Sequence, residues 1–427
     1  MSKSKVKISL KAKIIFMLMP LICLIIFEIV ARLIYPDTRI PPLQGEEIPP
    51  LDSAEYADPA SEKVLERNYR VVLKAGRMLE LPIHERDRDC FYTPVPGSTF
   101  SFRKPGSYIV NYKINSLGYR NDEFSVEKDK NKLRIICAGD SSTFGFFVNQ
   151  HDTYPERLKR LLHNYTIEKN AEVINAGILA YSSYQGSRFI DKYLRNLKPD
   201  ILVVSYGFND SYKGILSDPE IELESSKMHR LKKSMRKFAT YRLIESVLLP
   251  SNDRKLPPGG VPRVSPEEYR LNIEKIIEIC REENIHLIFL PISVPLTYMK
   301  ILKEIASEIN CSLIDTEKVL SVHHKKFLEE GIKDYKGIKF GQIAKKGFDP
   351  YHHKRYDSKE MVEMRQFNYL FIDYCHPAPV GYQLIAESIY EYLLEQGFFT
   401  RTEGIIEKPP DIKTFSTKTG TIPVLTK

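Results

Sequence analysis

Five short apolar runs, alternating with helical patterns, constrain the fold of this chain most strongly. Consecutive apolar residues of this kind suit strands that are buried on both faces. The runs are Arg134–Gly139, Glu172–Ala176, Ile201–Tyr206, His286–Pro291 and Ser312–Asp315. The helical patterns cover Tyr154–Leu162, Ser187–Asn196, Pro266–Glu283 and Leu296–Ile309. Repeated strand–helix units predict an α/β fold in which helices cover both faces of a parallel sheet.

The alternation predicts one main domain with appendages, which the length of 427 residues allows. We expect the main domain at residues 131–398. Two insertions, at 213–265 and 321–370, interrupt its strand–helix pattern. Before it, residues 84–130 show aromatic alternation and Gly-Pro turns that are typical of short strands, so we expect a small β-rich lead-in there.

The segments outside these domains have simpler compositions. Residues 36–83 begin with proline-rich sequence and continue with a helical pattern, which predicts an extended stalk followed by a helix. Residues 399–427 contain Pro409-Pro410 and Thr/Lys-rich sequence, and we expect a flexible tail.

The N-terminus combines a basic start with an apolar run. Five lysines precede residues 14–27, which contain no charged residue. With its continuation to Tyr35, the stretch 14–35 can cross a bilayer at about 1.5 Å per residue. We therefore predict a cytoplasmic tail at 1–13, a transmembrane anchor at 14–35 and an extracytoplasmic body. A cleaved signal peptide is the alternative, although no small-x-small site follows, and a lipoprotein at Cys23 lacks the small residue expected before the cysteine.

Charge and cysteine usage exclude several function classes. Most of the net charge of +8 lies in the N-terminal tail and in residues 401–427, so the body is nearly neutral and no nucleic-acid partner is predicted. The six cysteines show no C-x-x-C spacing, which disfavours zinc and thiol redox chemistry and suggests isolated buried thiols. The pairs His323-His324 and His352-His353 lack metal-ligand spacing, so we predict no metal and no cofactor.

A sharp Gly139-Asp140-Ser141 turn follows the first strand, where open α/β sheets bind their ligands. The serine could cap the next helix, hold a phosphate or act as a nucleophile. A nucleophilic serine needs a base that takes its proton and a third group that orients the base. Asp373 and His376, three residues apart on a turn before an apolar helix, can supply this pair. For this segment alone, a helix-capping Asp and an incidental surface His remain the alternative.

Two further loops belong at the same edge of the sheet. After Ile201–Tyr206, Gly207 allows a tight turn and Asn209 offers a side-chain amide. A fixed donor at a developing oxyanion is worth about 10²–10³ in turnover. The alternative is an Asn-Asp turn chosen for its backbone conformation. The segment NAGILAYSSYQG, after Glu172–Ala176, could present backbone N–H groups to the same oxygen. Four loops thus supply a serine, backbone donors, an amide and an Asp/His pair.

In their order and placement these blocks resemble the SGNH (GDSL-type) hydrolase superfamily over about residues 130–395. The matching residues are Gly139-Asp140-Ser141, Gly207-x-Asn209-Asp210 and Asp373-x-x-His376. The resemblance implies a three-layer, flavodoxin-like fold with a five-stranded parallel sheet. It also implies that Ser141 is the nucleophile and that His376 is the general base, oriented by Asp373.

The same resemblance implies an oxyanion hole made of the Ser141 N–H, the Asn209 side chain and an N–H of the second block, which is the segment NAGILAYSSYQG. In that block the usual glycine falls on Ala180, and Gly177 is a rival three residues earlier. Asp140 is expected to brace the loop rather than to belong to the triad, with Gly207 as a supporting residue.

Together with the predicted anchor, this resemblance implies an extracytoplasmic, membrane-anchored serine esterase that acts on O-acyl esters, such as acetyl esters, of surface polysaccharide. Membrane-tethered members of the superfamily often tailor such groups. An O-acyltransferase with the same triad and a lipid or lysophospholipid esterase are the nearest alternatives. A flavodoxin-like module that binds phosphate or FMN at Ser141-Ser142-Thr143 would leave Asp373 and His376 without a purpose. An inactive glycan-binding scaffold would leave the whole set unused.

Overall fold

The computed structural model of the chain describes the body and a few isolated residues outside it. The described residues are 83–103, 109–214, 217–220, 261–339, 369–372 and 375–402, with Met19, Cys23, Ile25–Val30, Phe238 and Thr240. The chain forms two compact units, Met1–Pro41 with Glu220–Pro258 and Pro42–Pro219 with Gly259–Lys427. In the first unit the backbone N–H of Thr240 donates to Glu28 Oε2 over 2.9 Å. All elements below belong to the second unit.

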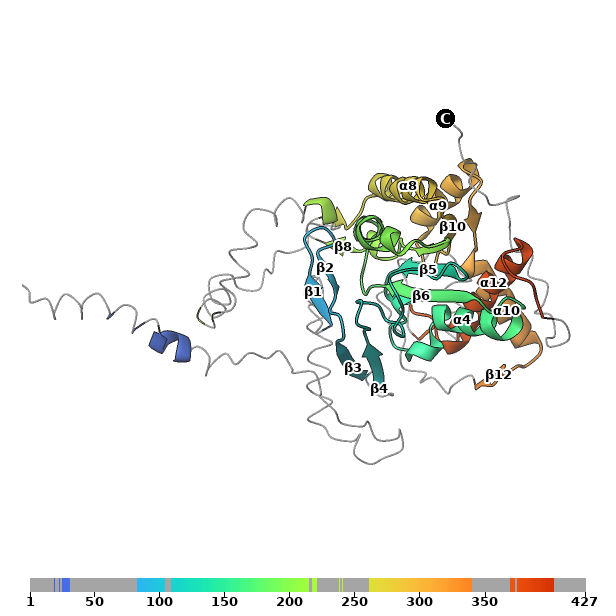
Figure 1. Cartoon of the computed structure of the whole chain (residues 1–427), viewed down its shortest axis with the longest axis horizontal. Helices are drawn as coiled ribbons and strands as arrows, with labels where there is room; N and C mark the ends of the chain where they lie inside the picture. The colour runs from blue at the N-terminus through green and yellow to red at the C-terminus, as the bar shows by residue number, and fades with distance from the viewer. Residues whose placement is uncertain are drawn as a thin grey trace, which may run out of the picture. The chain divides into compact units, whose positions relative to one another are not determined.

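A five-stranded parallel sheet forms the centre of this unit (Figure 1). Its strands are β5 (Leu133–Gly139), β6 (Ala171–Gly177), β7 (Ile201–Ser205), β10 (His286–Phe289) and β11 (Ser312–Leu313). Their order is β11-β10-β7-β5-β6, so the chain runs to one side after β5 and to the other after β6. The five predicted strands and the parallel sheet are confirmed. The switch in direction lies at β5, beyond whose end Ser141 is placed.

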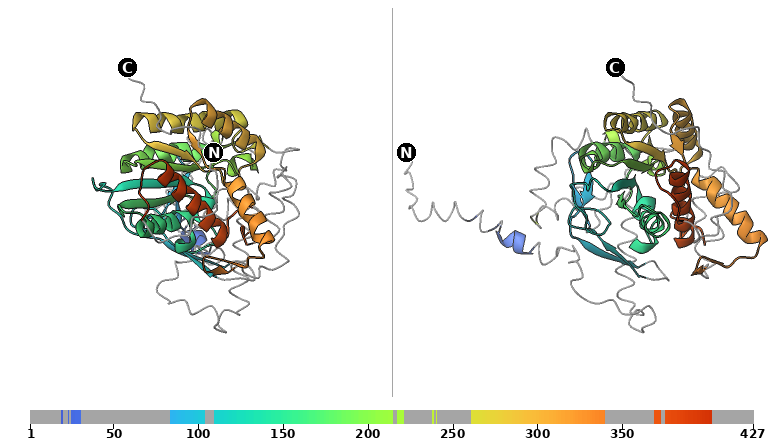
Figure 2. Two further views of the ribbon diagram at one scale, coloured as in Figure 1. Left: turned by 90° about the vertical axis from the view of Figure 1, so that its right-hand side faces the viewer. Right: turned by 45° about the vertical axis from the view of Figure 1, so that its right-hand side comes forward.

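Helices cover both faces of the sheet. They are α4 (Tyr154–Tyr165), α5 (Ser183–Phe189), α8 (Pro266–Glu282), α9 (Leu296–Glu308), α10 (Thr316–Glu329) and α12 (Pro379–Glu395). Helices α8 and α9 lie on one side of the sheet and α4, α10 and α12 on the other (Figure 1). Helix α12, drawn in red, packs beside α10 and α4 (Figure 2).

Local sequence signals explain where the helices begin. Helix α8 starts with a capping box, in which Ser265 and Glu268 each bond the other's backbone N–H, and Pro266 occupies its first turn. Helix α5 starts with a second capping box between Ser182 and Gln185, earlier than the predicted start at Ser187. Helix α10 extends across the predicted start of the second insertion at residue 321.

The lead-in contains two antiparallel hairpins, as its alternating sequence predicts. Strands β1 (His84–Arg86) and β2 (Tyr92–Pro94) form the first, and β3 (Thr99–Arg103) and β4 (Ile109–Lys113) form the second. Val110, Tyr112 and Ile114 are buried in the same apolar cluster as the main domain. The lead-in therefore shares its core with the sheet and helices that carry the site.

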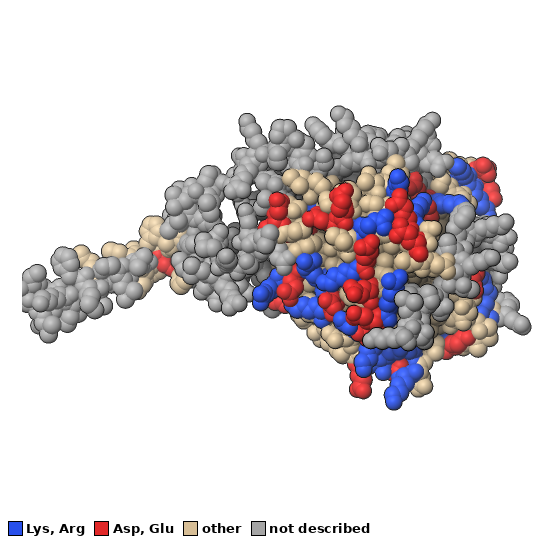
Figure 3. All heavy atoms as spheres, turned by 90° about the horizontal axis from the view of Figure 1, so that it is seen from above, with Lys and Arg blue, Asp and Glu red and all other residues tan. Residues whose placement is uncertain are grey.

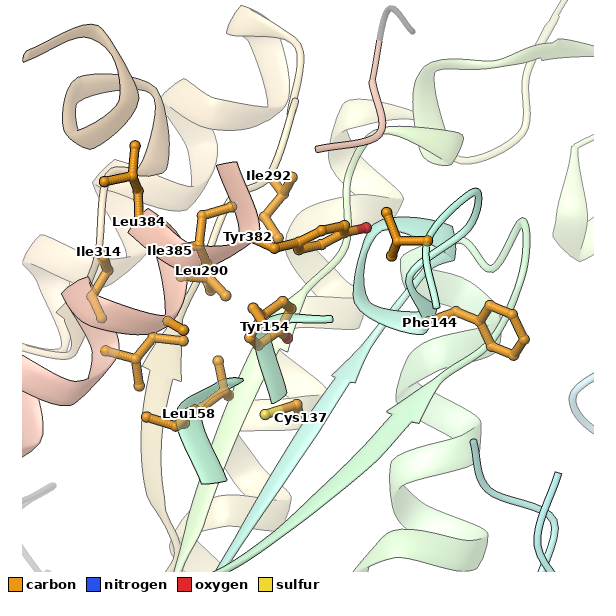
Figure 4. Packing of buried hydrophobic residues seen from close by; sticks show 14 of the residues in the cluster. Cys137, Phe144, Tyr154, Leu158, Leu290, Ile292, Ile314, Tyr382, Leu384 and Ile385 are labelled. Atoms are coloured by element: carbon orange, nitrogen blue, oxygen red, sulfur yellow. The ribbon is translucent and has the colours of Figure 1, made fainter. Parts of the chain in front are cut away.

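The main core lies between the sheet and helices α4 and α12 (Figure 4). Cys137 of β5 packs there with Tyr154 and Leu158 of α4 and with Tyr382 and Ile385 of α12. The cysteines at 90, 137, 280, 311 and 375 are all buried. Burial of these apolar groups fixes α12, and with it the turn that precedes α12, against the end of the sheet.

Several predicted segments lie outside the described residues. These are most of the anchor at 14–35, the stalk at 36–82, most of both insertions and the tail beyond Thr402. Among the helices within the described residues, none has the length and apolar content that crossing a membrane requires. On the face shown in Figure 3, acidic and basic side chains of the described residues are interspersed.

Candidate active site

Ser141 occupies the first position of a short helix, α3 (Ser141–Phe144), directly after β5. Asp140 caps this helix, because its Oδ1 accepts a hydrogen bond of 2.8 Å from the backbone N–H of Ser142. A Cβ on Gly139 would lie 2.1 Å from Thr143 Oγ1 and 2.8 Å from the carbonyl oxygen of Ser205. The strand can therefore turn this tightly into the helix only with glycine at position 139.

His376 meets Ser141 from the opposite end of the sequence. Its Nε2 lies 2.8 Å from Ser141 Oγ, although 235 residues separate the two along the chain. Backbone hydrogen bonds from Ile372 to His376 and from Ala378 to Leu370 close the turn that carries the imidazole. The structure thus brings together the serine and the histidine that the sequence blocks predict.

Two aromatic rings after α3 flank the imidazole. Phe146 and Phe147 approach the His376 ring edge to face, with ring centroids 5.3 and 5.4 Å away. His376 is only 7% exposed, and its Nδ1 lies 3.4 Å from Cys375 Sγ. Asp373 lies outside the described residues, so its role as the orienting acid stays a prediction.

The Asn209 amide lies beside the Gly-Asp-Ser turn. Its Nδ2 donates to Asp140 Oδ2 over 3.1 Å and to the carbonyl oxygen of Tyr181 over 3.0 Å. Gly207 adopts φ +134°, which L side chains rarely adopt, and a Cβ there would lie 2.8 Å from Val294 Cγ1. The amide thereby connects the turn after β5 to the loop after β6.

Ala180 and Gly177 differ in their surroundings. Ala180 lies in a turn after β6 and has φ +59°, in the left-handed region that favours glycine. Gly177 is the last residue of β6, and its N–H donates to Asn175 Oδ1 over 3.0 Å. A Cβ on Gly177 would lie 2.1 Å from the backbone nitrogen of Phe144. Gly177 therefore permits close packing of α3 on β6, whereas Ala180 lies in the turn after β6 and is only partly buried.

Comparison with known families identifies the chain. Residues 137–384, more than half of the chain, match the GDSL-like Lipase/Acylhydrolase family. The chain belongs to this family. A comparison with curated proteins gave no match.

Solved structures that resemble this GDSL-like family member include two bacterial enzymes. One is the lipase/acylhydrolase from Enterococcus faecalis, 17% identical, with a TM-score of 0.34 over 64% of this chain and 99% of the other. Another is an acetylxylan esterase from Geobacillus stearothermophilus, 14% identical, with a TM-score of 0.35 over 61% of this chain and 93% of the other. The predicted ester hydrolase is confirmed at the level of the family.

Burial disfavours the charged form of the carboxyl groups around this site. It raises the pKa of Asp140 to about 6, although hydrogen bonds from Ser142 act in the opposite direction. It also raises the pKa of Asp210 to about 7, against the hydrogen bonds from Ser183. The loops at the sheet edge are therefore held by buried polar groups that little water reaches.

Sequence reasoning missed two residues that support the segment from Phe144 to Val148, at the end of α3 and just after it. Arg120, 1% exposed, donates to the carbonyl oxygens of Phe144, Gly145 and Val148 over 2.8, 2.6 and 2.7 Å. Tyr112 Oη accepts from the Phe147 N–H over 3.0 Å. Both residues precede the part of the chain that matches the family. No local pattern marks them, because their partners are backbone groups more than 20 residues away.

The buried histidines of the second insertion have protein partners. His323 Nδ1 lies 2.9 Å from the carbonyl oxygen of Val319, and His324 Nδ1 contacts the Tyr369 hydroxyl. Within the described residues, no group of three or more His, Cys, Asp or Glu side chains is placed to hold a metal ion.

Proposed function

We propose that the protein is a serine ester hydrolase in which Ser141 is the nucleophile and His376 the general base. The 2.8 Å contact between His376 Nε2 and Ser141 Oγ carries this proposal. At this distance the imidazole can take the hydroxyl proton while Oγ attacks an acyl carbon. Asp373, three residues before His376, is proposed to orient the ring.

The reaction proceeds in two halves. Attack by Ser141 Oγ forms a tetrahedral intermediate; His376 then gives the proton to the departing alcohol, which leaves an acyl-serine. Water attacks this ester while His376 takes the water's proton, and His376 then returns that proton to Ser141 Oγ as the bond to the acyl carbon breaks and the free acid departs. The N–H groups of Ser141 and Ala180 are proposed to bind the oxyanion. The Asn209 amide would join them by exchanging one of its two present acceptors, Asp140 or the Tyr181 carbonyl.

The proposed substrates are O-acyl esters, such as acetyl esters, of surface polysaccharide. The predicted export supports this choice, because the five lysines before residues 14–27 favour an N-terminal anchor and an extracytoplasmic body. Incubation with acetylated polysaccharide should release acetate faster than incubation with lysophospholipid releases fatty acid. Transfer of the acetyl group to an added glycan in preference to water would establish the transferase instead.

Active-site labelling tests the chemistry itself. A fluorophosphonate probe should label the folded wild type, and Ser141→Ala and His376→Ala should each abolish labelling, because the probe requires an activated serine. Ser187→Ala is the matched control: its hydroxyl bonds the Tyr184 carbonyl within helix α5, over 3.2 Å, and labelling should persist. A folded wild type that neither labels nor cleaves a simple acetyl ester would overturn the proposal.

A further inference from the structure

The peptide bond that carries the Ala180 N–H is held by a side chain of the lead-in. The hydroxyl of Tyr92, in β2, donates to the carbonyl oxygen of Leu179 over 2.6 Å. The Leu179 carbonyl and the Ala180 N–H belong to one trans peptide, so they point in opposite directions. Fixing the direction of the carbonyl therefore fixes the direction of the N–H.

The backbone conformation of this turn depends on stabilising contacts. Ala180 adopts the left-handed conformation, which is unfavourable for an L-residue and persists where the surroundings enforce it. Three consecutive carbonyl oxygens of the turn accept hydrogen bonds from side chains of three distant segments. The pairs are Tyr92 with Leu179, Arg263 with Ala180 at 2.7 Å, and Asn209 with Tyr181 at 3.0 Å.

Tyr92 and Arg263 are themselves fixed in place. The Tyr181 hydroxyl donates to the Tyr92 carbonyl, and the two rings meet edge to face with centroids 5.3 Å apart. Arg263 forms two hydrogen bonds to Asp218, of 3.0 and 2.9 Å. Burial raises the pKa of Tyr92 well above its usual range, so its hydroxyl stays a donor at every working pH.

We propose that Tyr92 is a positioning residue for the reaction: its hydroxyl holds the Leu179–Ala180 peptide so that the Ala180 N–H faces the acyl oxygen at Ser141. The inference rests on the proposed ester hydrolysis. It extends the working active site to the first hairpin of the lead-in, before the residues that match the family.

Tyr92→Phe tests this role against a matched control, Tyr390→Phe. Tyr92 is 4% and Tyr390 2% exposed, and both donate to a backbone carbonyl, Tyr92 over 2.6 Å and Tyr390 to Tyr165 over 3.0 Å. Misdirecting an oxyanion-hole donor should lower kcat less than deleting it does. We therefore expect Tyr92→Phe to lower kcat about tenfold. KM should stay within about twofold, and the affinity for an alkyl boronic acid, which mimics the tetrahedral intermediate, should fall by the same factor as kcat.

The outcomes separate the inference from the proposed function. Tyr390→Phe should lower the melting temperature about as much as Tyr92→Phe while keeping kcat within about twofold, since it loses a comparable hydrogen bond between α12 and the end of α4, away from Ser141. Equal kcat values for the two variants would show that the inference is wrong while hydrolysis stands. An inactive wild type would instead overturn the hydrolase.

A second variant covers the case in which Tyr92→Phe does not fold. Arg263→Lys keeps a positive charge beside Asp218 but lacks the fork that also reaches the Ala180 carbonyl. It should lower kcat and leave KM unchanged. An unchanged kcat would contradict the inference that side-chain hydrogen bonds to this turn position the Ala180 N–H.

Discussion

Gly177 and Ala180, three residues apart in the second block, have different structural roles. Gly177→Ala would place a Cβ 2.1 Å from the backbone nitrogen of Phe144 and 2.6 Å from the carbonyl carbon of Thr143. Backbone atoms cannot move aside as a flexible side chain can, so we expect the free energy of unfolding to fall by about 2–3 kcal/mol. Urea denaturation measures the change.

Ala180→Gly is the matched comparison at the residue scale. Glycine relieves the left-handed conformation at φ +59° but adds entropy to the unfolded chain, so the two effects nearly offset and stability should change by less than about 1 kcal/mol. A large loss at Ala180 with none at Gly177 would reverse the two assignments.

The predictability of the site also differs from residue to residue. Ser141 and Asn209 follow buried strands, and His376 precedes an apolar helix, so local patterns predict that they meet at one edge of the sheet. Tyr92 and Arg263 act on carbonyl oxygens 87 and 83 residues away. A backbone carbonyl has no sequence signature, so no pattern in the chain predicts these contacts.

At the scale of elements, Arg120 joins the lead-in to the segment after α3. It is buried between the rings of Tyr112 and Phe144, with its Cζ 4.6 and 4.9 Å from their centroids. Its three acceptors are carbonyls of the segment that also carries Phe146 and Phe147. Arg120 thus fixes the aromatic rings that flank His376.

We expect Arg120→Met to lower the free energy of unfolding by about 3 kcal/mol or more, since three buried carbonyls lose their donor. Esterase activity should fall with it. Arg195→Met is the control: Arg195 is partly exposed and pairs with Glu282 and Glu283, so its loss should lower the free energy of unfolding far less than Arg120→Met does. Equal costs for the two variants, measured by urea denaturation, would contradict the bracing role of Arg120.

The strands of the sheet are predictable because each is a consecutive apolar run, which depends little on its surroundings. Helix α10 is harder to predict. Its buried face includes His323 and His324 beside Val319, Leu320 and Phe327, so polar residues interrupt the apolar period. Burial of these histidines is tolerated because Nδ1 of each has a backbone or tyrosine partner, and these contacts exist only in the folded chain.

At the scale of the whole molecule, buried Asp210 makes stability depend on pH. Its pKa is about 7 in the folded protein, raised by burial, against about 3.9 in an unfolded chain. Between these values the folded state binds more protons, so this contribution to stability is complete below about pH 4 and is lost as the pH rises through 7. The free energy of unfolding of wild type relative to Asp210→Asn should therefore decline over that range.

Asp87 provides a control, because its contribution to stability changes with pH in the opposite direction. Burial alone would raise its pKa, but hydrogen bonds from Tyr193, Cys90 and Lys192 lower it to about 2. Its contribution is present above about pH 4 and is lost as the pH falls toward 2. Wild type relative to Asp87→Asn should thus gain stability as the pH rises from 2 to 4. Denaturation midpoints across the pH series give both comparisons, and a flat difference for Asp210 would contradict the prediction.

The hydrogen bonds that Tyr92, Arg263 and Asn209 donate to the turn at 178–181 limit how this enzyme can be truncated and engineered. A fragment cut at residue 131 would keep Ser141 and His376 but lose the Tyr92 hydroxyl and the Arg120 guanidinium that fix the two loops. The shortest fragment worth expressing therefore begins before residue 83. By the same logic, a loop transplanted from another esterase into this turn needs a matching hairpin, and libraries that alter substrate range should vary the loop and the first hairpin together.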